Sequence, residues 1–303
     1  MKRVLSLIVN PAHGHASDAL RAAMERVGTL LAKEGHTPDW KTLSTGEAVE
    51  TIFETSEENL DHVRAHLPPL LHDLPVDRAL LPPDQRRKAL FLADMDSTMI
   101  MIECIDELAD YAGVKDQVAK VTEAAMRGEL DFAASLRARV ALLSGLNADV
   151  LEACYTERVR ITPGAETLVK TMTAHGTHTV LVSGGFTFFT GRVAARLGFD
   201  EHIANRLDIR DGRLTGEVLP PISDANTKLA TLEDRRSKMQ LTKHQTLAVG
   251  DGANDVPMIH AAGLGIAFRA KEKAVQAADV ALSHTDLGAV LFLQGYSRPE
   301  FAA

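Results

Sequence analysis

The chain has 303 residues, of which 45% are hydrophobic and 24% are charged, so it is long enough to bury the cores of two domains. Its net charge is −8 and no basic run offsets it, which argues against nucleic acid or an anionic membrane as the main partner. Nothing in it approaches the roughly 18 consecutive apolar residues of a transmembrane helix, so no membrane span is expected.

Residues 1–84 are predicted to form a small first domain with the element order β-α-β-β-α-β. Strands are expected at Val4–Val9, Thr37–Leu43, Ala48–Thr55 and Arg78–Leu81, and helices at Ser17–Glu34 and Glu57–Leu67. This order is that of a ferredoxin-like α+β sandwich, and the domain looks like an ACT-type regulatory fold. It carries no cluster of catalytic residue types, so a plain docking or homodimerisation domain is an equal alternative.

A proline-bearing, charged linker over residues 81–88 is expected to lead into a second domain at residues 85–303. Its first strand includes Phe91 and runs up to Asp94. Helices with no strand between them then predict an inserted helical cap at about residues 99–160. They are expected at Met99–Val114, after Asp116, at about Asp131–Leu143 and at Ala148–Val159.

Strands and helices alternate again after residue 160. A helix is expected from an N-cap at Thr162 to His175, and a hairpin with an Asp211-Gly212 turn between two short strands. The other strands are expected at Thr179–Val182, Thr246–Val249, Gly265–Phe268 and Val280–Leu282, and the other helices at Thr187–Leu197, Thr227–Met239, Asp255–Ala262, Glu272–Ala278 and Leu287–Gln294. The pattern predicts an α/β doubly wound, Rossmann-like parallel sheet, with ligands beyond the carboxyl ends of its strands.

Asp94 and Asp96 stand at the end of the strand that contains Phe91. Alternation along a strand would send both carboxylates to one side, where they repel each other and need a cation or solvent. Mg²⁺ prefers such oxygen ligands. The alternative is an ordinary strand-to-helix turn in which Ser97 or Thr98 caps a helix.

Further polar groups follow other elements of the same sheet: Ser183-Gly184 after a strand, Lys228 near a helix start, and Asp251 with Asp255 in the run G-D-G-A-N-D. Each has an ordinary explanation, as a turn serine, a solvated lysine or a helix cap. Together they offer oxygen ligands for Mg²⁺ and a hydroxyl, backbone donors and a cation for phosphate oxygens. The combination predicts phosphoryl chemistry.

The motifs D-M-D-S-T, S-G-G-F, an isolated lysine and G-D-G-A-N-D-V-P-M resemble, in order and spacing, those of the haloacid dehalogenase-type phosphatases. The resemblance covers about residues 88–295. Within that family the chain is most similar to the members that hydrolyse phosphoserine, because four cap positions also match: Glu103, Met126, Phe132 and Arg139. The resemblance implies a Mg²⁺-dependent phosphatase for the last step of serine biosynthesis.

It also implies a role for each residue. Asp94 would attack phosphorus to form an aspartyl-phosphate, and Asp96 would serve as general acid and then as general base. Mg²⁺ would be held by the side chains of Asp94 and Asp251 and by the backbone carbonyl of Asp96. The remaining roles are phosphate binding by Ser183, Gly184 and Lys228, substrate binding by Asn254, support by Asp255, ammonium and carboxylate recognition by Glu103 and Arg139, and enclosure by Met126 and Phe132.

Two other functions stay open at this point. A phosphotransferase would pass the same aspartyl-phosphate to another alcohol, and no motif separates it from a phosphatase. A non-enzymatic amino-acid sensor would suit the ACT-like domain but has no use for the Asp94/Asp96 pair. The two cysteines, Cys104 and Cys154, lack C-x-x-C spacing and predict buried thiols in a reducing cytoplasm.

Overall fold

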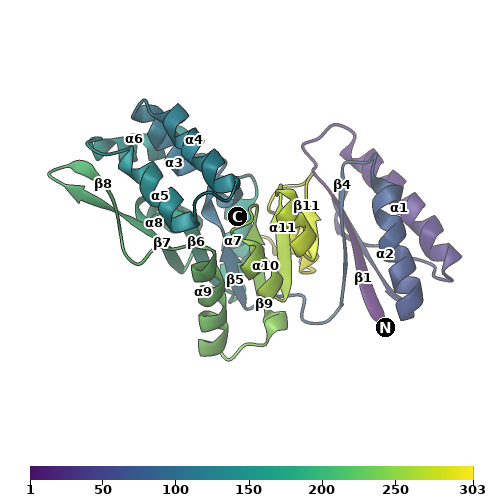
Figure 1. Cartoon of the computed structure of the whole chain (residues 1–303). Coiled ribbons are helices and arrows are strands. Elements are labelled where there is room, and N and C mark those ends of the chain that lie inside the picture. Colours follow the sequence, from purple (N-terminus) through teal and green to yellow (C-terminus); the bar gives the residue numbers. More distant parts are fainter. Residues whose placement is uncertain (303) are drawn as a thin grey trace.

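The structure is a computed structural model that describes residues 1–302, with the side chain of Met126 outside the described part. Figure 1 shows three parts side by side: the N-terminal domain with α1 and α2, a central α/β core, and a helical cap around α3–α6. Within residues 1–302, no helix has both the length and the apolar character needed to cross a membrane.

The N-terminal domain has the predicted ferredoxin-like arrangement. Its sheet is antiparallel with the strand order β2-β3-β1-β4. The elements are β1 (Lys2–Val9), α1 (Ala16–Lys33), β2 (Lys41–Ser44), β3 (Ala48–Glu54), α2 (Glu57–Leu71) and β4 (Val76–Leu81). The second strand starts four residues later than predicted, because Pro38 has no N–H to give to a ladder. The second helix continues through Pro68 and Pro69, and the buried Leu67 and Leu71 hold its last turn in place.

Both faces of this sheet carry buried apolar residues, which is unusual for a small antiparallel sheet. On one face, Leu5 and Leu7 of β1 pack against the two helices. On the other face, Ile8, Ala48 and Ala79 join the hydrophobic core of the second domain. The second domain therefore covers the face that solvent would otherwise reach, and the two domains share one continuous apolar contact.

One buried carboxylate fixes this contact. Asp77 of β4 accepts hydrogen bonds from the backbone N–H groups of Ser283 (2.9 Å) and Thr285 (2.9 Å) and from the Thr285 hydroxyl (2.7 Å). His284 donates its N–H to the same carboxylate at 3.1 Å. These donors belong to the turn that follows β11 (Val280–Leu282), so an N-terminal-domain side chain satisfies a loop of the core.

We expect Asp77→Ala to lower the free energy of unfolding by about 2–4 kcal/mol, because it leaves several buried donors without an acceptor. Chemical or thermal unfolding of the full chain measures this. Asp61→Ala is the matched control, since Asp61 lies in the same domain and pairs only with Arg64 on the surface, a contact worth about 0–1 kcal/mol. Equal losses in the two variants would contradict the assigned role of Asp77.

The core is the predicted Rossmann-like sheet, with the strand order β11-β10-β9-β5-β6-β7-β8 across the described residues. Its strands are parallel except for β8, which pairs antiparallel with β7. The strands are β5 (Leu90–Ala93), β6 (His178–Phe186), β7 (Glu201–Arg210), β8 (Arg213–Leu219), β9 (Thr246–Gly250), β10 (Leu264–Phe268) and β11. Helices α7 (Ala165–Ala174), α8 (Thr187–Leu197), α9 (Ala225–Lys238), α10 (Val256–Ala261), α11 (Glu272–Ala277) and α12 (Ala289–Leu293) pack around the sheet.

Strand β5 shows why its residues lie inside. Phe91 and Ala93 belong to one hydrophobic cluster, and Leu90 and Leu92 belong to another. Both faces of the strand are thus covered, as its unbroken apolar run predicts. The linker joins β4 to β5, and the predicted domain boundary at residue 84 falls within it and remains a prediction.

The cap contains the predicted helices α3 (Cys104–Tyr111), α4 (Lys115–Met126), α5 (Phe132–Ala141) and α6 (Asp149–Arg158). The prediction that the first of them starts at Met99 is wrong. Met99 instead ends a short π-helical turn at Met95–Met99, and the chain then pairs with residues 160–162: Met99 O accepts from Thr162 N (3.0 Å) and Met101 N donates to Arg160 O (2.9 Å). Two antiparallel segments therefore connect the cap to the core.

The predicted N-cap at Thr162 is also wrong, because α7 begins only after Gly164. Gly164 has a φ of 80°, and a Cβ there would lie 2.4 Å from the backbone nitrogen of Gly288. A left-handed residue in this tight contact interrupts the helix start, so Thr162 stays with the connecting segment. Strand β6 likewise extends beyond the predicted end and carries Ser183 through to Phe186.

Candidate active site

Four charged side chains from three parts of the core meet at the carboxyl ends of β5 and β9. Asp94 directly follows β5, Lys228 lies in α9, and Asp251 and Asp255 follow β9. The Lys228 ammonium is 2.6 Å from a carboxylate oxygen of Asp94 and 2.6 Å from one of Asp255. All three of these side chains are almost completely buried. This is the edge where ligands of such sheets bind.

The charges of this cluster do not balance. Burial and the nearby Asp255 carboxylate raise the pKa of Asp94 well above its usual range, and Lys228 offsets only part of that shift. Burial and Asp255 also raise the pKa of Asp251. Burial opposes the charge on Lys228, but Asp94 and Asp255 outweigh it and raise its pKa. The cluster thus contains one positive charge, on Lys228, for three carboxyl groups. A further cation would stabilise the charged forms of these groups.

The geometry fits a divalent cation. Asp94, Asp251 and Asp255 each offer an oxygen, and these oxygens lie within 4.8 Å of one another. Asp255 is already engaged, since it accepts from Lys228 and from the N–H groups of Asp251 (3.2 Å) and Gly252 (3.0 Å). Asp94 and Asp251 are therefore the better direct ligands, and Asp255 holds both Lys228 and the Asp251 loop in position.

The Asp94–Thr98 segment leaves the strand and turns sharply, so strand alternation does not govern its two aspartates. Asp94 is the N-cap of the π-helical turn at Met95–Met99 and accepts from Met95 N at 2.8 Å, and Glu103 precedes α3, so neither Ser97 nor Thr98 is a helix N-cap. Asp96 instead accepts from Cys104 N (3.0 Å) and from the Ser183 hydroxyl (3.2 Å). The Thr98 hydroxyl donates to Asp251 at 3.2 Å.

Asp96 is thus held separately from Asp94, at the border between core and cap. Burial raises its pKa above the ordinary value, and the hydrogen bonds from Cys104 and Ser183 limit the increase. A carboxyl group with this environment can retain a proton and later release it. The arrangement therefore gives the two aspartates different surroundings, Asp94 beside an ammonium and Asp96 between a backbone N–H and a hydroxyl.

The backbone of Ser183 and Gly184 is held in place by Asn205 and Ser223, and the role of Asn205 was not predicted from the sequence. Asn205 is fully buried and donates to Gly184 O (2.8 Å) and Ser223 O (3.1 Å). The Ser223 hydroxyl in turn donates to Ser183 O at 3.1 Å. Asn205 lies in β7 with no motif around it, so nothing in its local sequence points to this role.

Phe132 of the cap lies close to the backbone at Gly184. A Cβ at Gly184 would lie 3.0 Å from the Phe132 ring, so a glycine is what allows the ring to approach the backbone. Gly185 is similarly tight, because a Cβ there would lie 2.6 Å from an Asp96 carboxylate oxygen. The predicted enclosing residue Phe132 is therefore at the site, directly over the predicted phosphate-binding backbone.

The cap also presents a carboxylate and a guanidinium. Glu103 stands at the N-cap position of α3, not inside the helix as predicted, and accepts from the Ser97 hydroxyl at 2.6 Å. Burial and Asp96 raise the pKa of Glu103 to about 7. Arg139 of α5 is half-buried, and burial lowers its pKa while Asp106 and Glu103 counteract that shift. The two groups are near enough to interact electrostatically.

For two predicted site residues, Asn254 and Met126, the structure adds little about the predicted contact with substrate. Asn254 lies in the Asp251–Asp255 loop, where a Cβ on Gly252 would lie 2.3 Å from its side-chain oxygen, and its predicted substrate contact remains a prediction. Met126 ends α4, but its side chain lies outside the described residues. The constellation as a whole offers a nucleophile, an acid–base group, a cation site, phosphate donors and a pair of opposite charges in the cap.

Comparison with known proteins agrees with this chemistry. The haloacid dehalogenase-like hydrolase family model matches residues 91–260. A phosphoserine phosphatase of Streptomyces coelicolor is 47% identical over 232 residues, which are 76% of this chain and 56% of that protein. One from Idiomarina loihiensis is 46% identical over 202 residues, 67% of this chain and 91% of that protein. The chain spans about half the length of the Streptomyces relative and of the SerB2 phosphatase of Mycobacterium tuberculosis.

Solved structures extend the similarity to the whole chain. A probable phosphoserine phosphatase from Vibrio cholerae, in unliganded form, has a TM-score of 0.77 and 34% identity and covers 97% of this chain and 86% of its own. A structure of a phospho-aspartyl intermediate analogue of phosphoserine phosphatase has a TM-score of 0.63 and 41% identity, covering 68% and 98%. These relatives confirm the family resemblance predicted from the sequence.

Proposed function

The chain belongs to the haloacid dehalogenase-like hydrolase family, and from this premise we propose that it is a Mg²⁺-dependent phosphoserine phosphatase that works through an aspartyl-phosphate. The observation that carries the proposal is the buried Asp94–Lys228–Asp255 cluster with Asp251 beside it, facing a cap that holds Glu103 and Arg139. The similarity to proteins named phosphoserine phosphatases supports the choice of substrate.

In the proposed reaction, an Asp94 oxygen forms a bond to phosphorus while the bond between phosphorus and the serine oxygen breaks. Asp96 gives its proton to the departing oxygen. In the second step Asp96 takes a proton from water, the water oxygen attacks phosphorus, and phosphate leaves Asp94. Lys228 and the Ser183-Gly184 stretch hold the phosphate oxygens. A bound Mg²⁺, held by Asp94, Asp251 and the Asp96 carbonyl, would neutralise phosphate charge.

Substrate choice is assigned to the cap. Arg139 would pair with the substrate carboxylate and Glu103 with its ammonium, while Phe132 would close over the phosphate. A substrate ammonium would also favour the charged form of Glu103, whose pKa of about 7 leaves it partly protonated at neutral pH. Met126 and Asn254 complete the proposed contacts.

The proposal is tested by phosphate release from a panel of phosphorylated amino acids and sugars. We expect phosphoserine to be the best substrate. A metal chelator should abolish turnover, because two buried carboxylates and the half-buried Asp251 then face one ammonium, and added Mg²⁺ should restore it. Full activity in the chelator would exclude the metal, and a sugar phosphate as best substrate would exclude the assignment to phosphoserine.

Arg139→Ala should lower kcat/KM for phosphoserine by about ten- to several hundred-fold, the equivalent of a lost charge-assisted hydrogen bond. Activity on p-nitrophenyl phosphate, which lacks the carboxylate, should change little. Arg137→Ala is the matched control, since Arg137 is exposed on the same helix. Similar losses on both substrates would mean that Arg139 supports the cap fold.

We further propose that the enzyme acts in the cytoplasm, in serine biosynthesis, and the two buried free cysteines support a reducing compartment. A homodimer and an amino-acid-binding role for the N-terminal domain stay predictions. Phosphotransfer remains the alternative function, and product analysis with an added acceptor alcohol separates it from hydrolysis. The sensor alternative is disfavoured by the Asp94–Lys228 pair, since a sensor has no use for it.

A further inference from the structure

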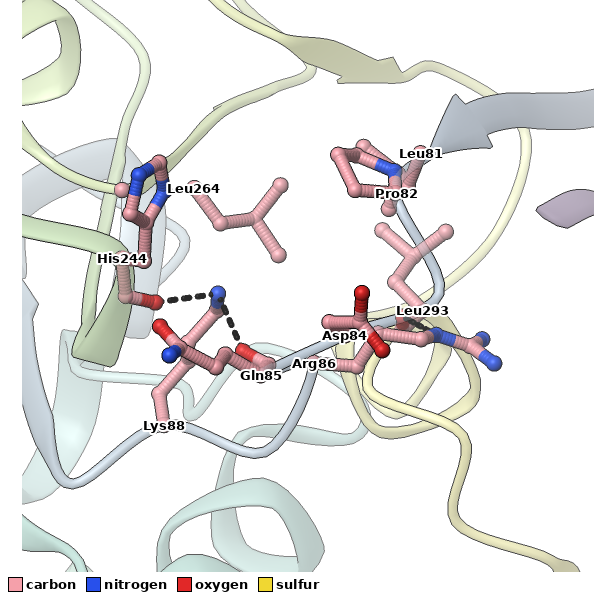
Figure 2. A pocket seen from close by; sticks show the side chains of 10 residues that line it. Leu81, Pro82, Asp84, Gln85, Arg86, Lys88, His244, Leu264 and Leu293 are labelled. Carbon is pink, nitrogen blue, oxygen red and sulfur yellow. Dashed lines mark hydrogen bonds between the residues drawn. The ribbon is translucent and has the colours of Figure 1, made fainter. Parts of the chain in front are cut away.

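A cavity of about 260 Å³ lies between the linker and the core, away from the candidate active site. Figure 2 shows it between linker residues and the side chains of His244, Leu264 and Leu293. Leu264 begins β10, and Lys88 precedes the first residue of β5 by two positions. The cavity is therefore at the amino ends of the parallel strands, whereas Asp94 follows the carboxyl end of β5.

A buried lysine faces this cavity. Lys88 is 9% exposed, and its ammonium donates to the carbonyl oxygens of Gln85 (2.8 Å) and His244 (2.6 Å). Figure 2 shows both bonds, with the ammonium at the inner end of the side chain beside the open space. An ammonium has three N–H donors. The third has no acceptor among the residues that the structure describes.

The charge of Lys88 also lacks a direct counter-ion. No carboxylate of residues 1–302 forms an ion pair with it, although buried charges in proteins are normally paired. Burial lowers the pKa of Lys88 to about 8, Arg86 adds to this, and Asp279 counteracts it only in part. An anion in the cavity would supply the missing acceptor and the missing negative charge together.

The second cationic group on the cavity wall, the Arg86 guanidinium, already has hydrogen-bond and ion-pair partners. Arg86 donates to the carbonyl oxygens of Leu293 (3.1 Å) and Phe292 (3.1 Å) and pairs with Glu50 at 2.8 Å. One free N–H suits a single carboxylate better than a phosphate, which seeks several donors. The exposed carboxylate of Asp84 on the wall further disfavours a dianion.

Beside the polar residues Gln85 and His244, the wall carries four apolar side chains, Leu81 and Pro82 from the linker and Leu264 and Leu293 from the core. The volume is below the roughly 300–1,000 Å³ typical of pockets for drug-sized ligands. We propose that this linker cavity binds a small monocarboxylate with a compact apolar body, its carboxylate on the Lys88 ammonium and its body among these four residues. Such a ligand would contact the linker and the core at once.

The test uses the full chain and 4-methylpentanoate as the probe, with binding followed by ligand-observed NMR and by thermal midpoint. We expect saturable binding and a raised midpoint. The neutral isostere 4-methylpentanamide should bind about ten- to a hundred-fold more weakly, because it cannot neutralise Lys88. Because the readout is binding and not turnover, it does not depend on the proposed function.

Lys88→Met should weaken 4-methylpentanoate binding by a similar factor. Lys243→Met is the matched control, since Lys243 also donates to a backbone carbonyl nearby, that of His260, but lies outside the cavity and is exposed. If Lys88→Met does not fold, Pro82→Phe fills the cavity from its exposed side and should also abolish binding. Absence of saturable binding, equal binding of the amide, or unchanged binding in the folded Lys88 or Pro82 variant would overturn the proposal.

Discussion

Asp94→Asn is expected to reduce phosphoserine turnover by about four to six orders of magnitude, as losses of a covalent nucleophile typically do. Asparagine has nearly the same shape but no anionic oxygen to attack phosphorus. It also removes one proposed ligand of the metal and one of the two carboxylates that lie 2.6 Å from Lys228. Steady-state phosphate release measures the loss.

The same variant should fold without a loss of stability when no metal is present. Burial and then the nearby Asp255 carboxylate raise the pKa of Asp94, so replacing its carboxylate by a neutral amide removes an unfavourably buried charge while Lys228 keeps its contact with Asp255. Acid-quenched samples of the unmodified enzyme should carry phosphate on the peptide that contains Asp94. A folded Asp94→Asn protein with near-normal turnover would rule out the covalent mechanism.

Most of the candidate site could be predicted from the sequence because its members lie at or just beyond the carboxyl ends of strands of one parallel sheet. The carboxyl ends of such strands meet at one edge, so Asp94, Ser183 and Asp251 are brought together by topology alone. Lys228 is different, because an isolated lysine near a helix start has no local signal. It was singled out by its combination with the other motifs and by the family resemblance, and the structure places its ammonium between two buried carboxylates.

What the sequence could not predict depends on contacts between distant segments. Glu103 was expected inside a helix, because nothing local shows that residues 99–101 pair with residues 160–162 before the helix can begin. Asn205 has no motif around it, since its role is to satisfy two backbone carbonyls that come from other parts of the chain. Both errors arise where tertiary hydrogen bonds override local preference.

The packing of the N-terminal domain against the second domain also could not be predicted from the sequence. Strand β1 is apolar on both faces, which indicates that both are covered but not by what. The acceptor role of Asp77 required knowledge of the loop after β11, more than two hundred residues away in sequence. A buried charged residue such as Asp77 in a sheet indicates that another surface supplies its hydrogen bonds. Here that surface belongs to the second domain of the same chain.

Asp96→Asn is expected to slow phosphoserine turnover by about 10²–10⁴-fold, the usual worth of general acid–base catalysis. The asparagine oxygen can still accept from Cys104 N, and the NH₂ group that replaces the second oxygen can donate to the Ser183 hydroxyl oxygen, so the loop should keep its shape. It cannot donate a proton to the serine oxygen or take one from water. Rapid-quench kinetics should therefore show both formation and hydrolysis of the aspartyl-phosphate impaired.

A second substrate separates the two steps within the same variant. The p-nitrophenolate group leaves without needing a proton, so Asp96→Asn should form the aspartyl-phosphate from p-nitrophenyl phosphate at a nearly normal rate. Hydrolysis still needs a base, so the intermediate should accumulate and a burst of p-nitrophenolate should precede slow turnover. Normal hydrolysis without a burst would assign the base of the second step to another residue. An equal slowing of the first step with both substrates would mean that Asp96 positions the Asp94 loop through Cys104 and Ser183 instead of transferring protons.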